Sequence, residues 1–176
     1  MMRLERDSDG HWAFRHLAPF ELALLRDVPL AARPDGDGQA KRRLYPGLFQ
    51  RGRVDEEAER DWSELVHPSL QSLFESSLQR VQDDLDRACP SDTREHGEPL
   101  YDIRVPVAHA EAWLSGLNQA RLSLAERFDL YDEADEPRPL PEPPQTAAQQ
   151  MQWRAALQAE LYGYVMEWIL EHVIEP

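Results

Sequence analysis

The sequence has little of what marks secreted and membrane proteins. It contains a single cysteine, Cys89, which excludes an internal disulfide framework and is typical of a reducing compartment. A membrane-spanning helix needs roughly 18 consecutive apolar residues, and the richest stretch, LYGYVMEWIL, is interrupted by Glu167. The segment MMRLERDSDG at the start lacks the apolar core of a secretory signal. These absences predict a cytoplasmic protein with no membrane segment.

The signatures of common catalytic and cofactor sites are also absent. The chain has only eight glycines and no glycine-rich phosphate loop, and none of its serines lies in a G-x-S-x-G turn. Its six histidines form neither H-x-x-x-H nor H-E-x-x-H spacings. Asp86 and Asp92 lie near Cys89, and neighbouring carboxylates disfavour a reactive thiolate. We therefore expect no metal and no cofactor, and the sequence argues against an enzyme without excluding one.

Positive charge is scarce, and it gathers in one part of the chain. The net charge is −14; residues 1–54 hold ten Lys and Arg against seven Asp and Glu, whereas residues 55–176 hold nine against 26. Such acidity repels nucleic acid and phospholipid headgroups over most of the surface. The exception is KRRLYPGLFQRGR, residues 41–53, where aromatic residues lie among cations. The cations that could contact phosphate or an acidic partner are Lys41, Arg42, Arg43, Arg51 and Arg53.

Two interpretations of the basic segment 41–53 are open. It could serve a nucleic-acid-associated regulator, in which case binding should weaken steeply with salt. Alternatively, it could contact the acidic remainder of the chain, such as DEEAERD just after it, or an acidic protein partner. Because residues 55–176 carry nine positive and 26 negative charges, we favour the protein contact over nucleic acid.

Hydrophobic periodicity predicts a mainly helical fold. We expect five helices in an orthogonal-type bundle, over residues 19–32, 55–67, 68–88, 108–128 and 146–174. Pro29 should kink or end the first helix, and Pro68 should separate the second from the third. The last helix is apolar nearly all round, apart from a narrow strip of Glu160, Gly163, Glu167 and Glu171. This pattern predicts that it is buried on most sides, as the central helix or partly as a homodimer interface.

A small antiparallel sheet is expected beside the helices. Residues 2–6 and HWAFRHL, residues 11–17, alternate around the turn DSDG and predict a hairpin, to which residues 100–107 could add a third strand. Residues 90–99, PSDTREHGEP, are expected to form a loop. Residues 132–145 are acidic and rich in proline, and they predict a flexible, extended connector. The length fits a single domain over 1–176.

A charged residue interrupts the apolar face of the fourth predicted helix. Arg121 falls within the stripe formed by Trp113, Leu117, Leu124 and Phe128, and an unpaired buried guanidinium is costly. Glu21 intrudes in the same way on the first helix, so we expect Glu21 and Arg121 to form an interhelical ion pair, with Asn118 at its edge. The alternative is an anion-binding pocket in which Arg121 holds a carboxylate or phosphate. The structural pair is favoured over the pocket.

The same residues carry a family resemblance. The run W-L-x-x-L-N-x-x-R-L, at Trp113, Leu114, Leu117, Asn118, Arg121 and Leu122, and an earlier E-x-x-x-L-R at Glu21, Leu25 and Arg26, resemble an uncharacterised bacterial family, domain of unknown function 2017. The segments RRLYPGLF and LYGYVMEWILEHVI match in the same order, so the resemblance spans most of the chain. The chain departs from the family in its proline-rich insert at 133–144 and its basic 41–53 stretch. The resemblance implies no activity and no catalytic residue.

The leading functional hypothesis is a non-enzymatic cytoplasmic interaction or regulatory module with an unidentified protein partner. Two alternatives stay open: a nucleic-acid-associated regulator that uses residues 41–53, and a small-anion-binding protein centred on Arg121. We expect no membrane partner.

Overall fold

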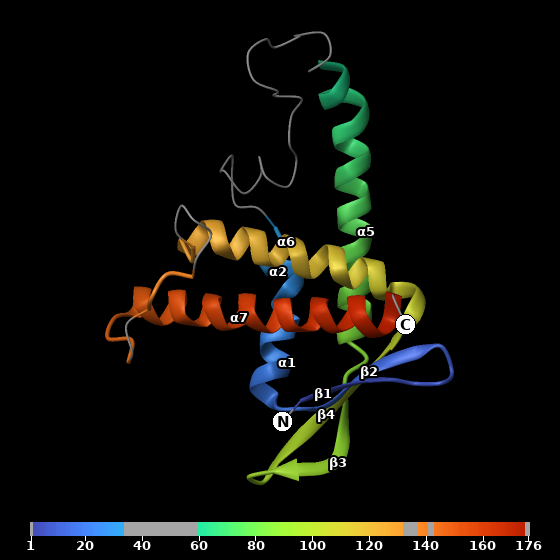
Figure 1. Ribbon diagram of the computed structural model, residues 1–176, viewed down its shortest axis with the longest axis vertical. Coiled ribbons are helices and arrows are strands. Elements are labelled where there is room, and N and C mark those ends of the chain that lie inside the picture. The colour runs from blue at the N-terminus through green and yellow to red at the C-terminus, as the bar shows by residue number, and fades with distance from the viewer. Residues whose placement is uncertain (1, 34–59, 132–136, 141–142, 175–176) are drawn as a thin grey trace.

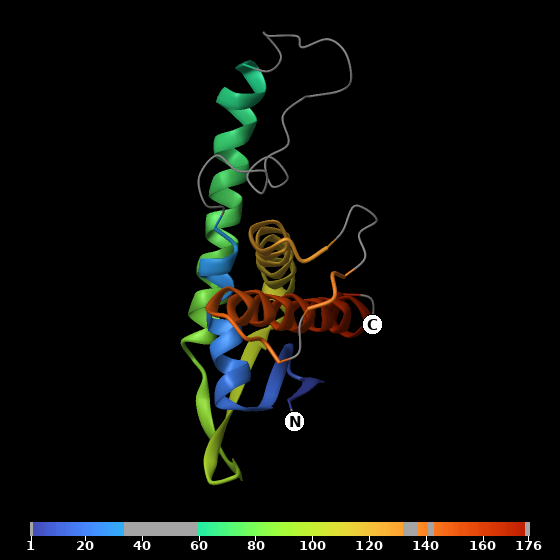
Figure 2. The same ribbon diagram turned by 90° about the vertical axis from the view of Figure 1, so that its left-hand side faces the viewer.

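The helices form two roughly perpendicular sets above a small sheet (Figure 1). The computed structural model describes residues 2–33, 60–131, 137–140 and 143–174. Helix makes up 62% of these residues and strand 21%. Helices α6 (Ala110–Phe128) and α7 (Ala147–Ile169) lie side by side and antiparallel, and α5 (His67–Leu85) crosses them steeply in both views (Figures 1 and 2). The prediction of a mainly helical fold with a small antiparallel sheet is confirmed.

The sheet has one strand more than the sequence predicted. Its strands are β1 (Arg3–Arg6), β2 (His11–Leu17), β3 (Cys89–Glu95) and β4 (Glu98–Pro106), all antiparallel in the order β1-β2-β4-β3. The predicted hairpin and third strand are therefore correct, but β3 was expected to be a loop. It pairs with β4 through a tight turn in which His96 and Gly97 both have positive φ, the conformation that suits two-residue hairpins. Nearly all of β3 is exposed, so it has no apolar alternation to reveal it.

Proline has different effects in two of the helices. Helix α1 (Pro19–Arg26) ends at Asp27 and α2 (Val28–Ala31) follows, so the break predicted from Pro29 is confirmed. Pro68, by contrast, separates nothing: a π-helical stretch, Trp62–Val66, leads directly into α5. A π turn changes the hydrogen-bond register just before the proline, which has no N–H to donate. Four helical units, counting α1 and α2 as one, therefore replace the predicted five among the described residues.

The centre of the molecule is α6 rather than the last helix. Helix α6 follows a short 3-10 turn, Val107–His109, and packs against α2, α5 and α7. Helix α7 begins at a capping box of Thr146 and Gln149, and a π-helical turn, Leu170–Ile174, extends it. One face of α7 is buried, but the large apolar side chains Met151, Trp153 and Tyr164 of α7, and Leu170 just after it, are exposed. Burial on most sides was therefore a wrong prediction, and a homodimer interface on α7 stays a prediction.

The core joins the sheet to the helices through aromatic rings. Trp12 and Phe14 of β2 are fully buried beside Trp113 of α6; the ring centroids of Trp12 and Trp113 are 5.5 Å apart. Tyr162 of α7 is also fully buried, and its hydroxyl donates to the backbone oxygen of Leu24 at 2.6 Å. These contacts hold α6 and α7 in place and so position the cleft between them.

Candidate functional site

Glu21 and Arg121 do not form the predicted ion pair. Within the residues that the structure describes, no hydrogen bond or salt bridge joins their side chains. The Glu21 carboxylate instead accepts the backbone N–H of Ala18 at 2.8 Å and caps α1. Helix α1 packs against α7, whereas Arg121 lies on the far side of α7, so the two apolar stripes never face each other. Asn118 is exposed.

Arg121 lies against the backbone of Gly163 on α7. Its Cζ and Nε are both 3.5 Å from the point where a Cβ on Gly163 would stand. Its Nε is buried and has no hydrogen-bond partner. Leaving a buried donor without an acceptor costs about 1–3 kcal/mol. The guanidinium of Arg121 therefore lies against the α7 backbone at Gly163, and its hydrogen-bonding capacity is not used up.

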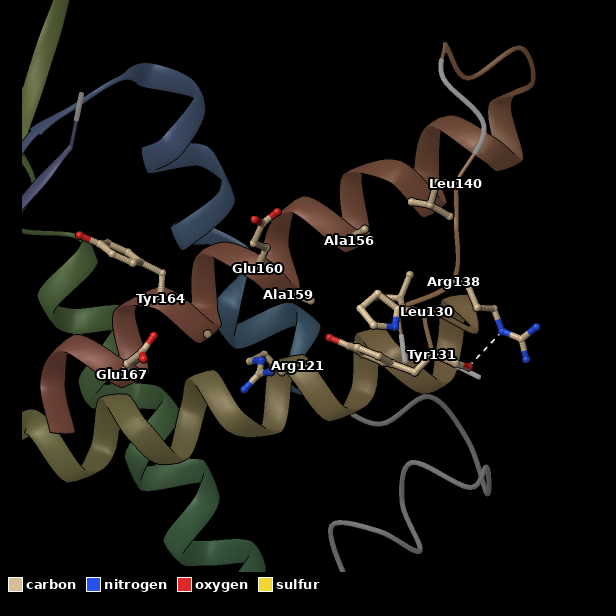
Figure 3. A pocket seen from close by; sticks show the side chains of 12 residues that line it. Arg121, Leu130, Tyr131, Arg138, Leu140, Ala156, Ala159, Glu160, Tyr164 and Glu167 are labelled. Carbon is tan, nitrogen blue, oxygen red and sulfur yellow. Dashed lines mark hydrogen bonds between the residues drawn. The ribbon is translucent and has the colours of Figure 1, made fainter. Parts of the chain in front are cut away.

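A cleft of about 560 Å³ opens beside Arg121, between α6, α7 and the segment 137–140 (Figure 3). Its apolar lining includes Leu130, Leu140, Ala156 and Ala159. In Figure 3 the hydroxyl end of Tyr131 points toward Arg121. A polar group that entered the cleft would therefore meet a guanidinium and a phenol between aliphatic walls.

The segment 137–140 is pinned to the end of α6 by Arg138. The backbone N–H of Arg138 donates to the Leu130 oxygen at 2.9 Å, and its Nε donates to the Tyr131 oxygen at 3.0 Å and lies 3.3 Å from the Asp129 carboxylate. Arg138 points away from Arg121 in Figure 3. Arg138 is therefore engaged in holding the wall of the cleft, and Arg121 is the other arginine among the described residues that line it.

Two acids lie at the rim of the cleft. Glu160 and Glu167 are exposed on α7, three residues before and four residues after Gly163. The carboxylate of Glu160 points away from Arg121 in Figure 3. Positive charge at the floor and negative charge at the rim favour a ligand with one small anionic group over one with several negative charges.

A smaller hollow of about 330 Å³ lies on the other side of α7, against α1. Its apolar lining comprises Phe20, Leu24, Leu157 and Leu161. Phe20 is 52% exposed and Tyr164 is 50% exposed, which is unusual for large aromatic side chains. Glu160 and Tyr164 line both hollows.

The buried polar anchor of the fold is Asp84, which the sequence analysis missed. Its fully buried carboxylate accepts hydrogen bonds from Trp113 Nε1 at 3.0 Å and Arg87 Nη1 at 3.1 Å, and His109 Nδ1 lies 2.9 Å away. This cluster joins α5 to α6. The signal was present: Asp84 lies between Val81 and Leu85 on the apolar face of its helix.

Other predicted features fall partly or wholly outside the described residues. The basic segment 41–53 lies wholly outside them, as do residues 132–136 and 141–142 of the expected connector.

The described residues include the only cysteine of the chain, Cys89, which is exposed and forms no disulfide. Among the residues with assigned positions, no three metal-ligating side chains cluster. None of the helices in those ranges is long and apolar enough to cross a bilayer.

Residues 1–174 match the family model described as Domain of unknown function (DUF2017), and the chain belongs to that family. The resemblance inferred from the W-L-x-x-L-N-x-x-R-L run is thereby confirmed. No curated protein and no solved structure matches the chain.

Proposed function

We propose that this member of the DUF2017 family is a non-enzymatic interaction module that holds a carboxylate group of its partner in the cleft between α6 and α7. The observation that carries the proposal is Arg121, whose Nε is buried and has no acceptor although the residue lines an open cleft. A ligand oxygen that accepted this hydrogen bond would recover the cost of the unused donor.

Guanidinium chemistry favours a carboxylate as the ligand group. The planar fork of arginine donates two parallel hydrogen bonds, whose spacing matches the two oxygens of a carboxylate. Phosphate can accept the same pair of hydrogen bonds but carries more negative charge, so Glu160 and Glu167 at the rim would repel it more strongly. Because Arg138 is engaged with Asp129 and the end of α6, a single guanidinium is available for the anion.

The size of the cleft supports recognition of one side chain or chain end rather than a flat protein surface. Its volume of about 560 Å³ is within the range of roughly 300–1,000 Å³ that is usual for ligand pockets. The aliphatic side chains beside Arg121 would contact the carbon atoms next to the carboxylate.

The test uses two probes that differ only in charge. We expect millimolar butyrate to shift the backbone amide resonances of Gly163 and Tyr131 saturably in ¹H–¹⁵N spectra, whereas butyramide has no such effect. Arg121→Met should abolish the response. The matched control is Arg94→Met, because Arg94 lies on the β3–β4 hairpin and donates to the Gly97 oxygen; this variant should respond like the unaltered protein.

A second pair of variants tests the place of binding. An added Cβ at Gly163 would meet the guanidinium at ordinary contact distance, 3.5 Å, so Gly163→Ala should retain the butyrate response. Gly163→Leu should remove it, because the longer side chain fills the space beside Arg121. An equal response to butyramide, a response that survives Arg121→Met, or stronger binding of inorganic phosphate would overturn the proposal.

A further inference from the structure

The apolar hollow between α1 and α7 lies next to the Arg121 cleft but has different chemistry. Phe20 and Leu24 of α1 face Leu157 and Leu161 of α7 across it. Phe20 and Tyr164 keep about half of their surface in water. Burial of apolar surface of this kind is the main favourable contribution to protein association.

The two hollows adjoin the same short stretch of α7. Glu160 and Tyr164 line both of them, one helical turn apart on the exposed side of the helix. Figure 3 shows Arg121 on one side of α7 and α1 on the other, with Glu160 directed toward α1. A ligand that leaves the cleft over these two residues therefore enters the apolar hollow.

We infer that the partner presents an extended peptide segment that crosses α7, with an acidic side chain in the Arg121 cleft and an apolar side chain in the α1–α7 hollow. The inference rests on the proposed function, since it takes the acidic side chain to be the source of the carboxylate. It adds the second contact, the class of partner and the spacing between the two anchoring residues.

The width of α7 determines that spacing. A helix with its side chains is about 10–12 Å across, and an extended chain advances about 3.3 Å per residue. Three or four residues therefore span the helix. Alternate side chains of an extended chain point the same way, so an even separation places both anchors on the face toward α7. The two anchoring residues are therefore four positions apart.

Charge limits what lies between the anchoring residues. The crossing passes the exposed carboxylate of Glu160, and the chain as a whole has a net charge of −14. Additional acids in the peptide would be repelled there, whereas neutral or basic residues would not. The preferred segment therefore has one acid, not an acidic run.

The inference is tested with fluorescein-labelled peptides and anisotropy. The parent peptide has Glu and Leu four positions apart in a Ser/Lys background. Replacing Glu by Gln, replacing Leu by Ser, or moving Leu next to Glu should each weaken binding about tenfold, because each change removes one of the two contacts. Adding two more Glu residues between the anchors should weaken it further.

Protein variants separate this inference from the proposed function. Phe20→Ala should weaken the parent peptide about tenfold yet leave the butyrate response unchanged, whereas Leu73→Ala, an exposed apolar truncation on α5, should alter neither. If Leu in the peptide and Phe20 in the protein make no difference while Arg121→Met still abolishes binding, the two-contact inference is wrong and the carboxylate site stands. If Arg121→Met changes neither the butyrate response nor the binding of the peptide, the proposed function and the two-contact inference are both wrong.

Discussion

A charged residue lies at each of two packing contacts of α6, and the two differ in whether their hydrogen-bonding groups have partners. Toward α5, the buried Asp84 carboxylate is surrounded by Trp113, His109 and Arg87, all within 3.1 Å. Toward α7, Arg121 lies on Gly163 and its buried Nε has no acceptor. Both residues interrupt apolar stripes, so a helical wheel alone does not distinguish them.

The difference separates a structural role from a binding role. A buried charge with all its partners in place holds two helices in one arrangement, and it has no capacity left for a ligand. A cation with an unused donor beside an open cleft contributes little to the fold and can recover that energy only from an added group. The physical criterion is therefore whether the hydrogen-bonding capacity is used up, more than whether the residue is buried.

The largest effect on stability is expected from removing the buried carboxylate of Asp84, whose hydrogen-bonding partners are all in place. Asp84→Ala leaves Trp113 Nε1 without its acceptor in the core and takes away the partner of His109, so it should lower the free energy of unfolding by about 3 kcal/mol. Urea unfolding followed by tryptophan fluorescence measures this. Asp86→Ala is the control. It alters an exposed carboxylate two residues farther along the chain and should change stability little. A loss of less than about 1 kcal/mol for Asp84→Ala would show that the anchor is dispensable.

A smaller loss of stability is expected from changing Tyr162, whose hydrogen bond to Leu24 joins α7 to α1. The comparison with Asp84 shows whether α7 is held to its neighbour as firmly as α5 is held to α6. Tyr162→Phe removes the hydrogen bond to Leu24 and should cost about 1 kcal/mol at pH 8. Burial, reinforced by the nearby Asp27, raises the pKa of Tyr162 well above its usual value. Above about pH 10 the unfolded chain loses this proton first, so stability should fall as the pH rises further.

The alkaline loss of stability should be smaller in Tyr162→Phe, because the group that titrates is gone. Urea midpoints at pH 8 and pH 10.5 measure the difference, and Tyr164→Phe, which alters an exposed tyrosine, should keep the pH dependence of the unaltered protein. Equal slopes in all three proteins would contradict a role for Tyr162 in alkaline unfolding.

The smallest effect on stability is expected at Arg121, which makes the contrast with Asp84 sharpest. Arg121→Met keeps an unbranched side chain that reaches about as far as Nε, beside Gly163, but removes a donor that has no acceptor. The free energy of unfolding should change by no more than about 0.5 kcal/mol, or rise. A large loss in the same urea assay would mean that Arg121 supports the fold and that the contrast between the two faces is false.

Sequence patterns predicted the elements whose side chains alternate between core and water. The hairpin of β1 and β2, the strand over 100–107 and the boundaries of α6 follow from apolar periodicity. Strand β3 was not predicted because its residues are exposed on both faces. The predicted helix break at Pro68 was wrong because a π turn just before the proline accommodates it. Local sequence contains neither the sheet partner nor the hydrogen-bond register that decided these cases.

The candidate site was predictable in part. The position of Arg121 in an apolar stripe drew attention to a side chain whose Nε is buried without an acceptor, and an anion pocket, one of the two interpretations offered, stays a proposal. The choice of Glu21 as its partner was wrong, because a helical wheel gives the direction of a side chain on its own helix and not which helix lies opposite. The contact of Arg121 with Gly163 was not predictable either, because it depends on which helix packs against α6.

The joint between α1 and α2 has a consequence for how the chain is made. Asp27 at this joint accepts hydrogen bonds from Arg154 at 2.6 Å and Gln158 at 2.9 Å, and Leu24 accepts one from Tyr162. A ribosome delivers the first helices well over a hundred residues before α7 emerges from it. The part of the α1–α2 surface that α7 covers therefore stays exposed until α7 itself has been synthesised, which is an interval in which uncovered apolar surface favours aggregation.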